Sequence, residues 1–283
     1  MSPTMKKLEL QHLAIGMESA VLTNENFFDN MAGRLTSFMS DVKSFLQVRL
    51  QNESSLAENV NFVVSYPQLI AKLQDINYTS VKSVTVHCPP GLSVTYLELL
   101  DKLEEASLIT NALQKDVLTP ILKWLAVHLS KPELFASFSG SSSIPDLKQH
   151  DLAGIKTKLQ LCFKESNTRT AIPYGEAFKR NADWNESIAR VRILQNSINS
   201  YPLAQLNDDV AELTKRFDIL IAKLESKNEL TLSANKVQAL SALCFAVAQE
   251  CEFYAFYSVQ LQSTLRALMD TEQVLAKAFN VVK

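Results

Sequence analysis

The stretch that decides the fold lies at the C-terminus and reads NKVQALSALCFAVAQECEFYAFYSVQLQSTLRALMDTEQVLAKAFNVVK at residues 235–283. Its apolar residues recur at every third or fourth position: Val237, Leu240, Cys244, Val247, Cys251, Tyr254, Leu261, Leu265, Leu268, Leu275 and Phe279. Ser258 and Glu272 interrupt the series, and Ser233 precedes it as an N-cap residue. The spacing predicts one long amphipathic helix.

The composition favours long helices in the rest of the chain as well. Only 6 glycines and 9 prolines occur in 283 residues, where average usage would give roughly 20 and 14. Hydrophobic residues make up 47% of the chain, which is enough for a sizeable core. The 28 basic and 30 acidic residues nearly balance, so no cationic field indicates a nucleic-acid partner. No apolar run approaches the roughly 18 to 20 residues of a membrane span, and we expect a cytoplasmic protein without membrane contact.

Further apolar stripes and caps divide the chain into predicted helices. They lie at about 24–50, 67–76, 96–118, 121–130 and 151–164, with two more that include Trp184 to Ile198 and Leu206 to Leu224. Thr95 with Glu98 predicts a capping box, and Thr119 with Pro120 predicts the start of a new helix. Residues 51–58 are predicted to form a loop, and 81–88 an extended connector or half of a hairpin.

These patterns together predict an all-α protein. We expect about seven to nine helices in an irregular antiparallel bundle, with at most one short β hairpin or extended connector. The predicted parts are an N-terminal arm at 1–22, a helical part at 23–138 and a second helical part at 139–283. The Ser-Gly-Ser-Ser-Ser run at 139–143 separates the two helical parts. We expect both parts to pack as one domain.

The chain shows no motif of a catalytic, metal or cofactor site. The four histidines are far apart, and the four cysteines lack CxxC spacing. Neither GxSxG nor GxxxxGK[ST] occurs. Cys244 and Cys251 are seven residues apart in the predicted helix, about 10 Å along its axis, which is too far for a disulfide. We therefore expect no catalytic residue, no metal and no cofactor, although an enzyme whose site is assembled from unlinked residues stays open.

An aromatic cluster in the last predicted helix has two interpretations. Phe253, Phe256 and Tyr257 add apolar surface beside the main stripe, so the helix is apolar nearly all round in its middle. Such a helix is typical of the centre of a bundle. The alternative is that Phe253, Phe256 and Tyr257 form an exposed flank on which a partner docks.

Three passages resemble a known family of proteins. The first is LAIGMESA at 13–20 with NENFF at 24–28, the second PGLSVTYLE at 90–98 with LEEA at 103–106, and the third LTPILKW at 118–124 with KPE at 131–133. Together they resemble the head and internal virion structural proteins of very large (jumbo) tailed bacteriophages. The resemblance implies a non-enzymatic protein of the phage capsid, made in the bacterial host cytoplasm and bound to other virion or assembly proteins. The alternative is a helical adaptor or scaffold that stays in the host cytoplasm.

The same resemblance implies a maturation step. Many head proteins of that family are cut by a prohead protease after a glutamate that follows a small residue two positions earlier. Gly16, Met17 and Glu18 fit that pattern, and cleavage there would remove the N-terminal arm. Ala248 to Glu250 also fits, but it lies in the middle of a predicted helix. The alternative is that Glu18 is an ordinary residue on a helix surface.

Overall fold

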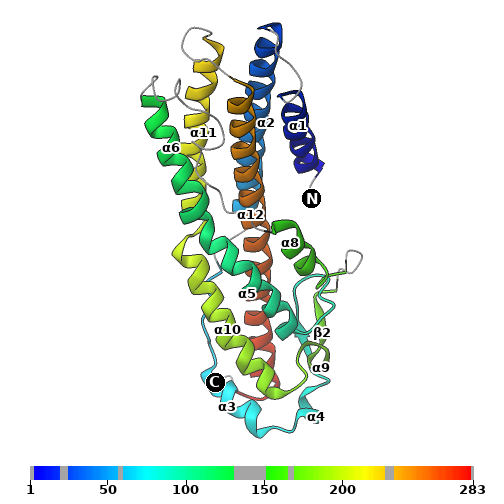
Figure 1. Ribbon diagram of the computed structural model, residues 1–283. Helices are drawn as coiled ribbons and strands as arrows, with labels where there is room; N and C mark the ends of the chain where they lie inside the picture. The colour runs from blue at the N-terminus through cyan, green and yellow to red at the C-terminus, as the bar shows by residue number, and fades with distance from the viewer. Residues whose placement is uncertain are drawn as a thin grey trace. The chain divides into compact units, whose positions relative to one another are not determined.

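The computed structural model of the protein describes residues 3–19, 25–56, 60–130, 151–164, 169–226 and 233–281. Most of these residues are helical, and the all-α prediction is confirmed (Figure 1). The chain forms two compact units, each assembled from three separate segments. Unit 1 comprises Met1–Glu53, Ala112–His150 and Leu203–Ala255, and unit 2 comprises Ser54–Asn111, Asp151–Pro202 and Phe256–Lys283.

Unit 1 consists of helices alone in the part that the structure describes. Its elements are α1 (Pro3–Ser19), most of α2 (Glu25–Leu56), the π-helix η1 (Leu113–Leu118), α6 (Thr119–Ser130), α11 (Leu203–Glu225) and the N-terminal part of α12 (Ala234–Ala278). The predicted stripe of α11 is confirmed, since Leu206, Val210, Leu213, Phe217, Leu220 and Leu224 are all buried. The side chain of Lys43 on α2 also forms an ion pair with Asp218 on α11, at 2.6 Å.

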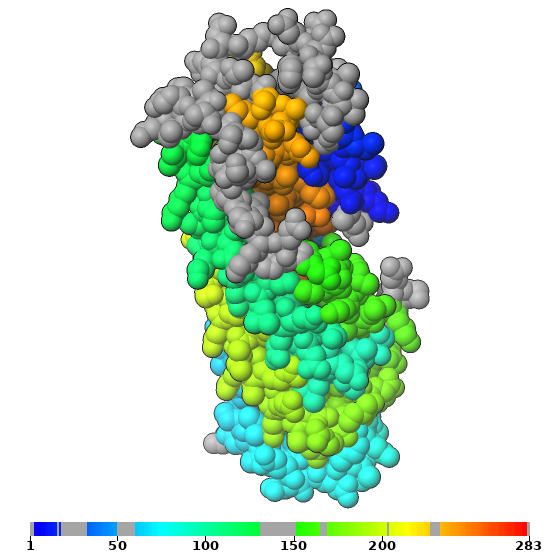
Figure 2. Space-filling view, in the orientation of Figure 1, coloured from blue at the N-terminus to red at the C-terminus, as the bar shows by residue number. Residues whose placement is uncertain are grey.

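Unit 2 combines helices with a small sheet. Its elements are α3 (Pro67–Asp75), α4 (Tyr78–Val81), β1 (Thr85–His87), α5 (Tyr96–Ala112), α8 (Leu152–Gln160), β2 (Ala171–Pro173), α9 (Tyr174–Ala177), α10 (Asn181–Ser200) and the C-terminal part of α12. Its core contains an aromatic group in which the Phe178 ring stacks on that of Tyr96 at 5.0 Å and meets that of Trp184 edge-on at 5.7 Å. Figure 2 shows α5 and α10 side by side on the visible surface of this unit.

Local signals in the sequence place the helix ends well. Ser233 accepts a hydrogen bond from the backbone N–H of Lys236 at the start of α12, as its N-cap role predicts. At the start of α5, the Thr95 N–H donates to the Glu98 carboxylate at 3.1 Å, and the Glu98 N–H donates to the Thr95 hydroxyl at 3.3 Å. The predicted capping box is therefore confirmed.

Two predicted interruptions are wrong. Residues 51–56 continue α2, because the stretch is polar but contains neither glycine nor proline. Thr119 is helical (φ −60°, ψ −45°) rather than an N-cap, and its N–H donates to the carbonyl of Gln114. This wider π-turn lets the helix continue past Pro120, whose ring would clash with the carbonyl four residues earlier in a regular α-helix.

The strand-like piece pairs with a segment far away in the chain. β1 is antiparallel to β2, with Val86 opposite Ile172 and His87 opposite Ala171. Between β1 and α5, Gly91 adopts a positive φ of 79°, which only glycine accepts without strain. Gly91 thus forms part of the turn between β1 and α5. The strand partner lies in the stretch before α10, for which we predict no strand.

An extended segment at 60–66 in unit 2 is held by side chains of α10 and α12. The N–H of Val60 donates to Gln262 Oε1 at 2.9 Å, and the N–H of Phe62 donates to Gln195 Oε1 at 3.1 Å. Both glutamine side chains are buried. They replace the backbone partners that a strand would otherwise supply.

Glu272 of α12 binds the C-terminal end of the same extended segment and caps α3, the helix that follows it. Its two carboxylate oxygens accept hydrogen bonds from the N–H groups of Ser65 and Tyr66, at 3.1 and 2.9 Å. These residues immediately precede Pro67, the first residue of α3. A buried carboxylate at the N-terminus of a helix satisfies free N–H groups and opposes the positive end of the helix dipole. Glu272, the polar residue that interrupts the apolar stripe of α12, thus forms a contact between α12 and the start of α3.

The two units do not coincide with the predicted division of the chain. Each unit takes residues from both sides of the predicted boundary at 138/139, and α1 belongs to unit 1. The boundary itself lies outside the described residues. The stripe of α12 is nevertheless confirmed over its whole length, because all eleven predicted positions except the half-buried Phe279 are buried.

Candidate functional site

The inner side of α1 binds the rest of unit 1 through apolar and aromatic contacts. Met5, Leu8 and Ile15 are buried. The ring of His12 stacks on Phe245 of α12 at 5.2 Å, and its Nδ1 lies 3.1 Å from the hydroxyl of Ser241. Burial lowers the pKa of His12, and the nearby Glu9 carboxylate opposes this shift more weakly. The ring is therefore favoured in its neutral form.

Polar contacts join α1 to α2 beside this apolar layer. The Asp41 carboxylate accepts hydrogen bonds from Gln11 Nε2 at 2.9 Å and from Lys7 Nζ at 3.1 Å. The hydrogen bond from the Gln11 amide is the main cause that lowers the pKa of Asp41, and Lys7 lowers it further. A surface pocket of about 360 Å³ lies between the two helices, with Leu8 and Phe45 among its apolar lining residues. Asp41 thus fixes how α1 lies along α2.

The outer side of α1 is also apolar, and its side chains are exposed. Leu10, Leu13 and Met17 recur at the spacing of one helix face and are 68%, 51% and 72% exposed. Lys6 is exposed and lies on the same face, four residues before Leu10. We call these four residues the outer face of α1. Contiguous exposed apolar side chains of this kind are typical of surfaces that bind other proteins.

The predicted protease recognition residues lie at the C-terminal end of the same helix. Gly16, Met17 and Glu18 fall in the last part of α1, which ends at Ser19. Met17 is exposed. A protease would have to unwind this last turn to reach the bond after Glu18, and terminal turns open at the lowest cost in free energy. Processing at Glu18 stays a prediction.

The aromatic cluster of α12 does not form the predicted docking surface, because two of its three predicted residues are buried. Phe253 and Tyr257 are buried. Phe256 is half-buried, and the Nζ of Lys156 lies 5.1 Å from the centre of its ring. The prediction of a docking surface at Phe253, Phe256 and Tyr257 is therefore corrected to a core assignment. The physical reason is that the middle of α12 is apolar on nearly every side and is enclosed accordingly.

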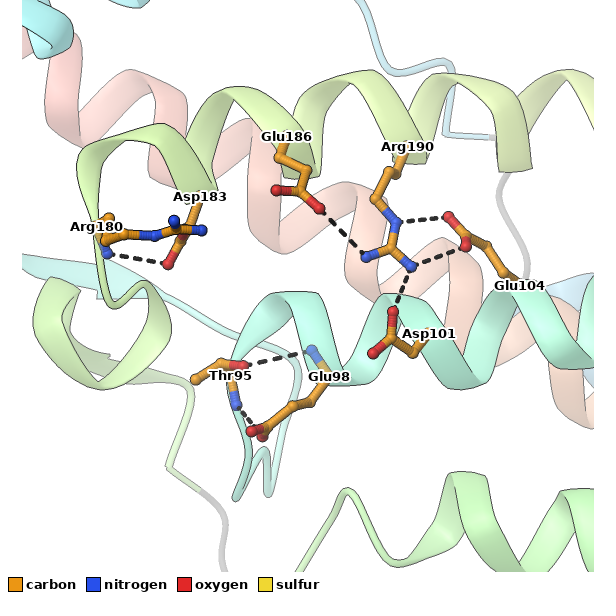
Figure 3. A network of polar contacts seen from close by, with 8 residues as sticks. All are labelled: Thr95, Glu98, Asp101, Glu104, Arg180, Asp183, Glu186 and Arg190. Atoms are coloured by element: carbon orange, nitrogen blue, oxygen red, sulfur yellow. Dashed lines mark hydrogen bonds and ion pairs between the residues drawn. The ribbon is translucent and has the colours of Figure 1, made fainter.

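A network of charges joins α5 to α10 on the surface of unit 2 (Figure 3). The guanidinium of Arg190 donates two hydrogen bonds to Glu104, at 2.6 and 2.8 Å, and a third to Asp101 at 2.6 Å. Glu186 lies one helical turn before Arg190 on α10, with a closest approach of 3.8 Å. The hydrogen bond with Glu104 is the main cause of the raised pKa of Arg190. Three carboxylates thus surround one cation, and the cluster is net negative.

Hydrogen bonds continue the contact between α5 and α10 further along the two helices. The hydroxyl of Ser197 donates to Asn111 Oδ1 at 2.5 Å and lies 3.2 Å from the hydroxyl of Ser107. Beside this line of contacts, Leu108 of α5 and Ile193 of α10 are 75% and 69% exposed. We call Leu108, Ile193 and the Arg190 cluster the α5–α10 seam.

Sequence reasoning missed both exposed surfaces. Their signal is present in the sequence as apolar residues that lie off the buried stripe of their own helix. Leu108 lies off the stripe of Leu99, Leu103 and Ala106, which are buried. A single off-stripe residue is common on protein surfaces. Only the packing of α5 against α10 shows that Leu108 and Ile193 border the same line of contacts.

Glu250 is a buried ionisable residue on α12 that no catalytic motif predicts. Glu250 is 5% exposed, and its loss of hydration raises the pKa of its carboxyl to about 7. Burial also raises the pKa of the thiols of Cys244 and Cys251 on the same helix. Their thiolates are disfavoured, so these cysteines are poor nucleophiles. Ala248 to Glu250, the second match to the protease pattern, lies within α12, and its glutamate is buried.

We expect Glu250→Gln to stabilise unit 1 by about 3 kcal/mol at pH 8 and to change little at pH 4.5. The folded pKa of about 7 lies above the ordinary value of 4.5. The folded chain therefore holds a proton that the unfolded chain releases, and stability is lost as the pH rises through this window. Urea unfolding of both proteins at the two pH values measures the difference. An equal gain at both would show that the carboxyl of Glu250 does not titrate with folding.

The described part of the chain contains no group of three or more His, Cys, Asp or Glu side chains that could hold a metal ion. It contains one helix, α12, that is long and apolar enough to cross a membrane, with a mean hydropathy of 1.2 over its most apolar window. Because 72% of that window is buried inside the protein, α12 also has the character of a core helix. No protein-family model, curated protein or solved structure matches the chain.

Proposed function

We propose that this protein is a non-enzymatic structural or internal head protein of a large bacteriophage and acts through helix-face contacts with other virion or assembly proteins. The outer face of α1 is the observation that supports this proposal. It presents Leu10, Leu13 and Met17 to solvent on a helix whose opposite side is already packed. A helix that is apolar on two sides has one side available for a partner.

The resemblance to phage head proteins supports the same proposal from the sequence. Its first passage, residues 13–20, includes Leu13 and Met17 of the outer face and Glu18 of the predicted cleavage site. Cleavage after Glu18 would remove α1 together with its outer face. In that case the contact belongs to assembly of the head rather than to the mature particle.

Mass spectrometry of purified phage particles tests the proposal. We expect the chain in particles at a fixed copy number, either intact or beginning at Ser19. A chain that begins at Ser19 would identify a processed head component, and an intact chain would keep the structural role without the maturation step. Presence in infected cells but absence from particles would overturn the head role. The outer face of α1 would then belong to a cytoplasmic helical adaptor or scaffold.

A further inference from the structure

The chain presents a second exposed apolar surface, and the net charge beside it is opposite to that of Lys6 on the outer face of α1. On the outer face of α1, Lys6 lies in line with Leu10, Leu13 and Met17. On the α5–α10 seam, Leu108 and Ile193 lie next to the net negative Arg190 cluster. Apolar residues with a lysine on one surface match apolar residues with carboxylates on the other.

Leu108 and Ile193 each follow a residue of the Arg190 cluster on their own helix. Leu108 follows Glu104 by one turn of α5, and Ile193 follows Arg190 by nearly one turn of α10. The hydrogen bonds of Arg190 with Glu104 hold the two helices together before these positions. The bond between Ser197 and Asn111 holds them together beyond these positions. Along their helices, Leu108 and Ile193 therefore lie between two fixed contacts of α5 with α10.

The charges near Leu108 and Ile193 are accessible. The side chains of Asp101, Glu104 and Glu186 are each about half exposed, while that of Arg190 is 17% exposed. The carboxylates consequently face solvent more than the cation that joins them. An incoming lysine gains attraction from Asp101 and Glu186 without displacing the contact between Arg190 and Glu104.

We propose that the outer face of α1 in one copy of the protein docks on the α5–α10 seam of a second copy. Leu10, Leu13 and Met17 lie against Leu108 and Ile193, and Lys6 lies near the exposed carboxylates. This inference rests on the proposed function, because it treats the outer face of α1 as a surface that contacts another protein. It adds that this partner is a second copy of the chain. Because the two surfaces differ, each bound pair leaves one of each kind free, and the contact builds head-to-tail chains.

The surfaces are small, so the association should be weak and concentration-dependent. Sedimentation equilibrium of the full chain measures it over a range of concentrations. We expect the average mass to rise above that of a monomer, and Leu13→Asp or Leu108→Asp to abolish the rise. Both residues are exposed, so both variants should keep the helical circular dichroism spectrum. Leu161→Asp, at an equally exposed leucine outside both surfaces, is the matched control and should associate normally.

Mixing the two inactive variants distinguishes this contact from a symmetric one. Leu13→Asp retains an intact seam and Leu108→Asp retains an intact α1, so an equal mixture should form dimers and nothing larger. Lys6→Glu should weaken association of the chain more than tenfold. Combining Lys6→Glu with Glu186→Lys in one chain should restore much of it, because the charges are then exchanged across every contact.

Three results would overturn the inference. The first is a wild-type chain that stays monomeric at every concentration. The second is normal self-association of Leu108→Asp, which would indicate a symmetric contact between α1 helices. The third is a mixture of the two variants that stays monomeric. A chain found in particles that does not self-associate would refute this inference alone, whereas a self-associating chain absent from particles would refute the head role alone.

Discussion

Replacing Leu265 by aspartate is expected to destabilise the protein by at least about 4 kcal/mol and to unfold unit 2. Leu265 is fully buried on α12. The substitution removes a large apolar side chain, which costs about 2 to 5 kcal/mol. It also places an unpaired carboxylate in the core, which must stay protonated or draw in water. Urea unfolding followed by circular dichroism measures the loss.

Leu108→Asp is the matched control for Leu265→Asp. It makes the same chemical change in the same unit, but at a residue that is mostly exposed. A surface substitution of this kind should change stability by no more than about 0.5 kcal/mol. Leu213→Asp, at a fully buried residue of α11, should unfold unit 1 for the same reason as Leu265→Asp. If Leu265→Asp kept wild-type stability, the assignment of this side of α12 to the core would be wrong.

Replacing Glu272 by alanine is expected to cost about 3 kcal/mol of stability. The change removes both acceptors of the Ser65 and Tyr66 N–H groups. A hydrogen bond to a charged group contributes about 1.5 to 3 kcal/mol to stability. It also removes the negative charge at the start of α3, which adds a smaller loss. Urea unfolding measures the total, and hydrogen exchange at Ser65 and Tyr66 reports the lost contacts directly.

Two further variants make the Glu272 result specific. Glu272→Gln keeps one acceptor oxygen and should lose about half as much stability. Gln273→Ala changes the exposed neighbouring residue on α12 and should have almost no effect. Equal losses for Glu272→Ala and Glu272→Gln would mean that charge, rather than the two hydrogen bonds, is what α3 requires. Unchanged exchange at Ser65 and Tyr66 in Glu272→Ala would contradict the capping role.

The helices themselves follow from the sequence, because the signals that specify them are local. The stripe from Val237 to Leu275 and the caps at Ser233 and Thr95 involve residues within a few positions of one another. The continuation past Pro120 could not be predicted in the same way. It depends on a π-turn that redirects the carbonyl contacts of one helical segment, and a proline is more often a helix boundary.

Glu272 shows what an apolar stripe in the sequence can predict and what it cannot. Its position as a polar interruption in an apolar series is visible in the sequence, but its partners at Ser65 and Tyr66 are about two hundred residues away. Arg190 with Glu104, and Leu108 with Ile193, likewise depend on α5 and α10 lying together. Helical periodicity predicts that a segment is helical and which of its faces is buried. It does not predict which other segment packs against that face. The helices and their buried faces are therefore properties of the chain alone, whereas the two interleaved units, the cap of α3 and the α5–α10 seam exist only once distant segments pack together.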